Sequence, residues 1–102
     1  MQNRRKHTRV PMRAQVTCIV DSQTFRGVSR DLSHGGIQVE MPELQTADIV
    51  QLMFRIPVSQ ALVDAIGAVV WTTERRHGIR FNSLGGHSQQ SIWKFIEESQ
   101  LT

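Results

Sequence analysis

The sequence has few of the residues that build covalent or metal-based frameworks. It contains one cysteine, Cys18, and no tyrosine. A single cysteine excludes an internal disulfide framework and a cysteine-based zinc cluster. The four histidines do not have the H-x-x-x-H or H-E-x-x-H spacing that is typical of metal sites. We therefore expect neither a bound metal nor a resident cofactor.

Long apolar runs are also missing. No stretch approaches the roughly 18 apolar residues that a membrane-spanning helix needs, and the basic N-terminus lacks the apolar segment of a secretory signal. The chain has 102 residues, of which 39% are hydrophobic, which suits one domain with its own core. The expected protein is a single cytoplasmic domain without membrane insertion.

Catalytic patterns are absent as well. Ser33 and His34 are neighbours, but no G-x-S-x-G motif surrounds them, and no paired carboxylates or nucleophile–base arrangement is visible. The sequence therefore favours a binding protein rather than an enzyme.

Positive charge is concentrated at one end of the chain. The chain has 12 Lys and Arg against 9 Asp and Glu, and five of the bases but none of the acids fall in residues 1–13. The remainder therefore has more acids than bases. This asymmetry favours a compact anionic ligand held at one end over a nucleic-acid polymer, which needs a whole basic face.

Alternation of apolar and polar residues predicts a chain built mostly of strands. Cys18 falls on the apolar side of the first strand, and Gly67 suggests a bulge within a long strand. Short strands with frequent turns and one terminal helix predict an all-β fold, a small six-stranded antiparallel β-barrel of split-barrel type, capped by a C-terminal α-helix. The expected strands cover residues 13–20, 24–31, 36–40, 48–56, 62–74 and 77–81.

A helix is expected at about residues 88–100. Ser88 is the candidate N-cap, and Ile92 and Ile96 lie on one apolar stripe. Trp71 and Trp93 are interpreted as core or helix-docking residues.

The basic segment reads as an extended arm over residues 1–12, because Pro11 disfavours a helix. Arg4, Arg5 and Arg9 supply guanidinium groups, whose planar fork binds phosphate oxygens or the O6/N7 edge of guanine. A solvated tail is the other reading of such a run.

A second polar segment lies between two expected strands, at residues 31–36. Asp31 and Ser33 are two residues apart and face the same side of an extended chain. Together they can accept hydrogen bonds from guanine and bond a sugar or phosphate. Gly35 and Gly36 permit positive φ and close approach of a ligand. His34 could contact the ligand or face solvent, and we expect solvent. The same pattern also fits an ordinary turn.

Taken together, the two segments resemble the signature of the PilZ domain, the bacterial receptor module for cyclic di-GMP. That signature is R-x-x-x-R, found here at residues 5–9, followed by [D/N]-x-[S/A]-x-x-G, found here at 31–36. Residues 69–71 and 78–81 also look like family landmarks. The resemblance implies a stand-alone second-messenger receptor, acting in processes such as motility and biofilm formation.

The resemblance also implies which residues bind the ligand. In the family, an arginine directly before R-x-x-x-R accompanies an intercalated pair of cyclic di-GMP molecules, which here implicates Arg4. The arm would close over the nucleotide on binding. The cyclic di-GMP-binding residues implied in this way are Arg4, Arg5, Arg9, Asp31, Ser33, Gly35 and Gly36.

Two other functions remain open from the sequence. One is a ligand-independent PilZ-like adaptor in pilus or flagellar machinery. The other is a small barrel that binds nucleic acid, although this needs exposed aromatic platforms and tyrosine is absent. The receptor interpretation requires an unidentified protein effector, and we expect a monomer or a weak homodimer.

Overall fold

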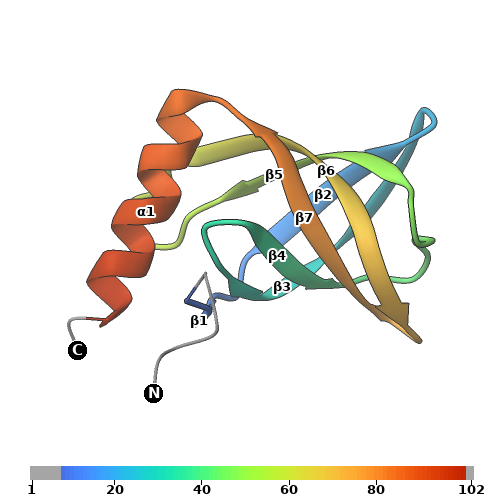
Figure 1. Ribbon diagram of the computed structural model, residues 1–102, viewed down its shortest axis with the longest axis horizontal. Helices are drawn as coiled ribbons and strands as arrows, with labels where there is room; N and C mark the ends of the chain where they lie inside the picture. The colour runs from blue at the N-terminus through green and yellow to red at the C-terminus, as the bar shows by residue number, and fades with distance from the viewer. Residues whose placement is uncertain (1–7, 101–102) are drawn as a thin grey trace, which may run out of the picture.

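The computed structural model describes residues 8–100, which form seven strands and one helix (Figure 1). Beyond the two-residue β1, the strands closely follow the ranges expected from the sequence. The elements are β1 (Val10–Pro11), β2 (Gln15–Val20), β3 (Gln23–Leu32), β4 (Gly36–Glu40), β5 (Ile49–Arg55), β6 (Leu62–Thr73), β7 (Arg76–Leu84) and α1 (Gly86–Gln100).

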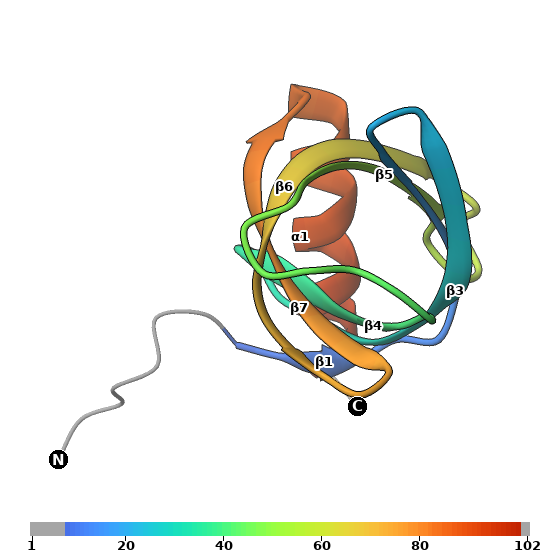
Figure 2. The same cartoon turned by 90° about the vertical axis from the view of Figure 1, so that its right-hand side faces the viewer.

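Six of the strands close into an antiparallel barrel. Their order is β3-β2-β5-β6-β7-β4, and β4 pairs back with β3 to complete the ring. The short β1 pairs with the end of β3, beyond the part of β3 that pairs with β2. Figure 2 looks into the barrel and shows α1 across its far end. The predicted six-stranded barrel with a C-terminal helix is therefore confirmed.

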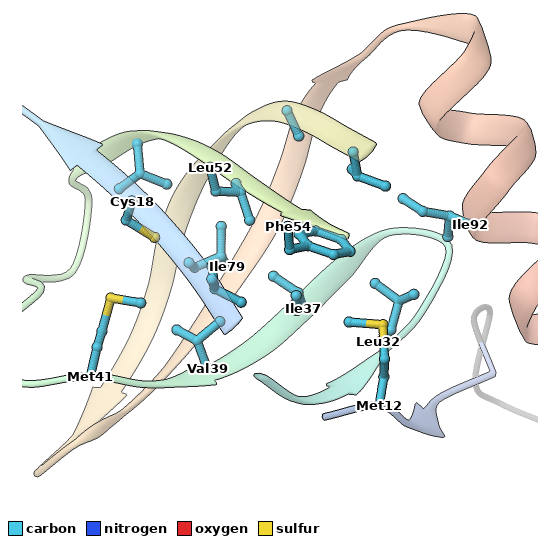
Figure 3. Close-up of a cluster of buried hydrophobic side chains, with 14 of the residues drawn as sticks. Met12, Cys18, Leu32, Ile37, Val39, Met41, Leu52, Phe54, Ile79 and Ile92 are labelled. Carbon is cyan, nitrogen blue, oxygen red and sulfur yellow. The ribbon is translucent and has the colours of Figure 1, made fainter. Parts of the chain in front are cut away.

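The barrel interior is filled by the apolar side of each strand. Cys18 is fully buried, and burial raises the pKa of its thiol to about 12. Ile92 points from α1 into the same cluster as Leu52 and Phe54 (Figure 3). Ile92 and Ile96 are both buried, so the predicted apolar stripe of the helix closes one end of the core.

Three details of the helix and the tryptophans differ from the sequence predictions. The helix begins at Gly86, and Ser88 is not its N-cap, because the Ser88 Oγ accepts a hydrogen bond of 3.3 Å from the Asp64 amide of β6. Trp71 and Trp93 are not core residues, with 38% and 50% of their surface exposed. Trp93 follows Ile92 directly and so points about 100° away from the buried stripe.

The end of the expected arm is part of the barrel. Val10 and Met12 are buried, and β1 pairs with the end of β3. The fully buried Ser29 donates its hydroxyl to the Met12 carbonyl at 2.6 Å and accepts from the Ala14 amide at 2.9 Å. These bonds hold residues 10–14 against β3, and so fix the backbone position of Arg9, which directly precedes them.

Three irregularities interrupt the ladders around the barrel. One lies at Ile66/Gly67, as predicted for Gly67, and the other two lie at Ser29/Asp31 and Val69/Trp71. Bulges of this kind re-aim side chains. The last two adjoin the residues described next.

Candidate functional site

The two sequence motifs meet at the edge of the barrel. In the β1–β3 ladder Pro11 lies opposite Asp31, which brings Arg9, just before β1, beside the end of β3. The Arg9 Nη1 donates to the Asp31 Oδ1 at 2.7 Å. The Arg9 side chain stays 44% exposed, so its guanidinium remains accessible from solvent.

The second carboxylate oxygen of Asp31 has a different partner. Gln38 lies directly opposite Asp31 in the β3–β4 ladder, and its Nε2 donates to the Asp31 Oδ2 at 2.8 Å. Its neighbours Ile37 and Val39 are buried, so Gln38 points outward from the barrel. Both oxygens of Asp31 are thus bound, one from the arm and one from β4.

Asp31 and Gln38 begin a row that continues across the outer surface. Gln38 is paired with Gly78 of β7, and Gly78 with Trp71 of β6. The strands β3, β4, β7 and β6 are neighbours in this order (Figure 1). Their pairing therefore places a carboxylate, an amide, a bare backbone and an indole in register.

The bulges explain why both ends of this row are accessible. Arg30 precedes Asp31 at one bulge, and Val70 precedes Trp71 at the other. At each bulge, two consecutive residues lie on the outside of the barrel. Arg30 is exposed beside the half-buried Asp31, and Val70 and Trp71 are both exposed. Each bulge adds one unpaired residue and turns the residue after it outward.

Trp71 lies flat over β7 because the residue opposite it is glycine. A Cβ at Gly78 would lie within 3 Å of three atoms of the indole ring, so any larger residue would displace the ring. The arrangement leaves one face of the indole partly exposed. Such a surface suits the stacking of a nucleotide base.

A hollow of about 560 Å³ joins these features, a size typical of small-molecule sites. Arg9 and Arg80 contribute positive charge to it. Residues from both sequence motifs therefore share one cavity with the aromatic surface. Its lining consists of Arg9, Ser33, Gly35, Gly36, Val70, Trp71, Gly78, Ile79, Arg80 and Phe81.

Ser33 organises the turn between β3 and β4. It is only 3% exposed, and its Oγ accepts from the Gly36 amide at 3.1 Å and the Gly35 amide at 3.3 Å. No glycine in the described chain has a positive φ, so the positive φ that Gly35 and Gly36 permit is not used here. A Cβ at Gly36 would lie 2.4 Å from the Ile79 carbonyl oxygen, so glycine is needed here for close strand packing.

The turn also contacts the helix. His34 was expected to face solvent, but its ring packs edge-on against Trp93 of α1, with centroids 5.2 Å apart and planes at 71°. His34 therefore does not face solvent alone, and this contact joins the β3–β4 turn to the C-terminal helix.

Arg4 and Arg5 lie outside the described residues. Gln38, Gly78, Trp71 and Arg80 were not among the predicted site residues, although Trp71, Gly78 and Arg80 fall in the segments 69–71 and 78–81. The signal that would have placed them together is the antiparallel pairing of 78–81 with β4 on one side and with 69–71 on the other.

A second hollow, of about 680 Å³, lies between α1 and the β5–β6 connection. Its lining includes Ile56, Pro57, Val58 and Phe95, and it contains none of the motif residues. It is less suited to an anionic nucleotide, because only Lys94 supplies a fixed positive charge there, and Glu98 lies beside it.

Residues 8–100 contain no cluster of three or more histidine, cysteine, aspartate or glutamate side chains placed to bind a metal. Within the same residues, no helix is both long and apolar enough to cross a bilayer.

Solved structures similar to this chain share its barrel. The inhibitor of motility MotI/DgrA of Bacillus subtilis matches with a TM-score of 0.85 and 19% identity, over 98% of this chain and 53% of that one. The PilZ domain of YcgR from Escherichia coli, solved with c-di-GMP, matches with a TM-score of 0.77 and 16% identity, over 97% and 93% of the two chains. This chain therefore spans about half of MotI.

No curated protein sequence matches this chain significantly. The family model described as "PilZ domain" matches residues 3–98, nearly the whole sequence. Both signature segments lie within that match, and the structure places Arg9 of the first against Asp31 of the second. The chain therefore belongs to the PilZ domain family.

Proposed function

We propose that this protein is a receptor for cyclic di-GMP. The observation that carries the proposal is the contact of Arg9 with Asp31, which joins the two signature segments beside a hollow that also contains Trp71. Membership of the PilZ family supports it, as does the similarity to YcgR structures that were solved with c-di-GMP.

The chemistry of the residues suits a guanine nucleotide. The Asp31 carboxylate can accept from the N1–H and N2–H groups of guanine, and the indole of Trp71 offers a stacking surface. Arg9 and Arg80 present guanidinium groups to phosphate oxygens or to the guanine O6/N7 edge. A cyclic dinucleotide offers acceptors of both kinds, because it contains two bases and two phosphates within one compact anion.

Arg9 is also the residue through which ligand binding would change the conformation of the protein. It is bonded to Asp31, and a nucleotide offers its guanidinium phosphate and guanine acceptors instead. Arg4 and Arg5 would join Arg9 in gripping the ligand, so the basic segment gains contacts that exist only in the bound state. Such a difference in contacts drives a conformational shift. The protein would relay this shift to a protein effector in the bacterial cytoplasm.

Arg4 leads us to expect two nucleotides per chain. Its guanidinium would stack on the additional guanine of an intercalated pair. The change Arg4→Ala should therefore lower the stoichiometry toward one nucleotide while binding persists. A parent protein that saturates at one nucleotide would contradict this part of the proposal.

Isothermal titration with cyclic di-GMP, cyclic di-AMP and GMP tests the proposal. We expect binding of cyclic di-GMP that GMP and cyclic di-AMP do not match. A parallel titration with a single-stranded oligonucleotide at two salt concentrations tests the nucleic-acid alternative, which requires binding that falls steeply with salt. A protein that binds none of these would instead be a ligand-independent adaptor.

A further inference from the structure

We propose that Gln38 determines how strictly this site selects guanine. On the proposed function, Gln38 fixes the plane of the Asp31 carboxylate, so that both oxygens meet the two adjacent N–H donors of the base. Gln38 is outside both signature segments, and the proposal rests on its contacts in the structure.

The two partners of Asp31 are held in different ways. Gln38 belongs to β4, which is paired on both sides, with β3 and with β7. Its donor atom contacts the Asp31 Oδ2 at 2.8 Å. Arg9 instead precedes the two-residue β1 and is 44% exposed. Asp31 thus has one partner fixed by the sheet and one that can exchange for a ligand.

The hydrogen-bonding capacity of a carboxylate allows both roles at once. Each oxygen has about two lone-pair sites, so Oδ2 can retain Gln38 and still accept from a base. Oδ1 is released when Arg9 turns to the nucleotide. Without Gln38 the carboxylate could rotate about its soft terminal torsion, and the alignment with two neighbouring donors would be lost.

The effect of Gln38 is therefore greatest for a base with two donors on this edge. Guanine has N1–H and the N2 amino group, whereas hypoxanthine has only N1–H. A rotated carboxylate can still meet one donor, but not two together. Loss of Gln38 should weaken binding of cyclic di-GMP far more than binding of cyclic di-IMP, the analogue that contains hypoxanthine.

The chain contains a matched control elsewhere on the barrel. Gln51 of β5 donates to the Asp64 Oδ1 of β6 at 3.5 Å, and both residues are exposed. Neither belongs to the row from Asp31 to Trp71, and neither lines the hollow that contains Arg9 and Trp71. The change Gln51→Leu removes the same kind of amide–carboxylate contact without touching the site.

The first experiment titrates the full chain and its Gln38→Leu and Gln51→Leu variants with cyclic di-GMP and cyclic di-IMP. We expect the parent to prefer cyclic di-GMP by roughly tenfold or more, the scale of a bidentate base contact. Gln38→Leu should lower that preference to about threefold or less, chiefly through weaker cyclic di-GMP binding, while Gln51→Leu leaves it unchanged. Thermal melts establish that each variant is folded.

The second experiment uses Gln38→Glu, which keeps the shape but places a second carboxyl beside Asp31. Like charges raise the pKa of such a pair, so one shared proton can restore the hydrogen bond in acid. Binding of cyclic di-GMP by this variant should recover by tenfold or more from pH 8 to about pH 5, relative to the parent.

Two outcomes would overturn the assignment of Gln38. One is an unchanged cyclic di-GMP preference in Gln38→Leu, and the other is an equal loss for both nucleotides. Failure of the parent itself to bind cyclic di-GMP is a different result, because it would remove the proposed function rather than the role of Gln38.

Discussion

The Arg9 Nη1 lies 2.7 Å from the Asp31 Oδ1, so the two halves of the PilZ signature are joined within the protein itself. The Arg9 side chain is 44% exposed and that of Asp31 23%. An ion pair this accessible contributes little to stability, typically under about 1 kcal/mol. On the proposed function, the role of this pair is in ligand binding.

We predict that Arg9→Ala and Asp31→Ala each weaken cyclic di-GMP binding by about 1–3 kcal/mol, the scale of one bidentate base contact. Their melting temperatures should stay close to that of the parent. Isothermal titration and thermal unfolding measure the two quantities.

The pair formed by Arg30 and Glu40 provides the control for this prediction. The Arg30 Nη1 lies 2.8 Å from the Glu40 Oε2, in a pair that joins β3 to β4 and whose side chains are 38% and 32% exposed. Arg30→Ala should leave the affinity within a factor of about two, because Arg30 and Glu40 lie outside the row from Asp31 to Trp71 and do not line the hollow. If Arg30→Ala were as damaging as Arg9→Ala, general electrostatic attraction would explain the binding better than a specific site.

Trp71 should stack on a base of the ligand. In a Trp93→Phe variant Trp71 is the only tryptophan, and its fluorescence should change on addition of cyclic di-GMP. Trp71→Ala should weaken binding by about 1–3 kcal/mol, the usual contribution of a base stacked on an aromatic ring. Fluorescence that does not respond to saturating ligand would show that Trp71 does not contact the ligand.

The barrel could be predicted because its signal is local. Strict alternation, as in Val16, Cys18 and Val20, reports which side of a strand is buried. The C-terminal helix was equally visible in the spacing of Ile92 and Ile96. The helix start was not, because Ser88 has the chemistry of an N-cap but faces β6 instead.

The site could be predicted only in part, because much of it depends on register. Arg9 and Asp31 are named by their motifs, whereas Gln38 and Trp71 join them only through pairing across four strands. A bulge shifts that pairing by one residue and reverses the side a residue faces. The bulge before Trp71 is the reason that this residue, interpreted as a core or helix-docking residue, is exposed.

Gly36 should be required for stability. A Cβ at this position would lie 2.4 Å from the Ile79 carbonyl oxygen, in the backbone of β7. We predict that Gly36→Ala destabilises the fold by about 1–3 kcal/mol, since the two strands must separate locally. Urea denaturation gives the value directly.

Gly86 is the matched comparison for Gly36. A Cβ at Gly86 meets nothing within 4 Å, and alanine is the better helix former by up to about 1 kcal/mol. Gly86→Ala should therefore be neutral or stabilising. Equal destabilisation by both changes would refute the close approach of β4 and β7 as the reason for glycine at position 36.

Cys18 should make the protein less stable in alkali. Burial raises the pKa of its thiol from 9.0 to about 12 in the folded chain, and the unfolded chain keeps the lower value. Below pH 9 the thiol is protonated in both states, so its full contribution to the free energy of unfolding is present. Between the two values the unfolded chain loses the proton and the folded chain retains it, so the free energy of unfolding falls by up to about 1.4 kcal/mol per pH unit.

The change Cys18→Ala isolates this effect. The variant lacks an ionising group at position 18, and the chain has no tyrosine that would titrate in the same range. Urea denaturation of both proteins from pH 8 to about pH 10.5 should give a steeper loss of stability for the parent. The cavity that alanine leaves lowers the free energy of unfolding by the same amount at every pH. Comparing the slopes of that free energy against pH therefore removes the cavity's effect. Parallel slopes would mean that the Cys18 thiol ionises as readily in the barrel as in the unfolded chain.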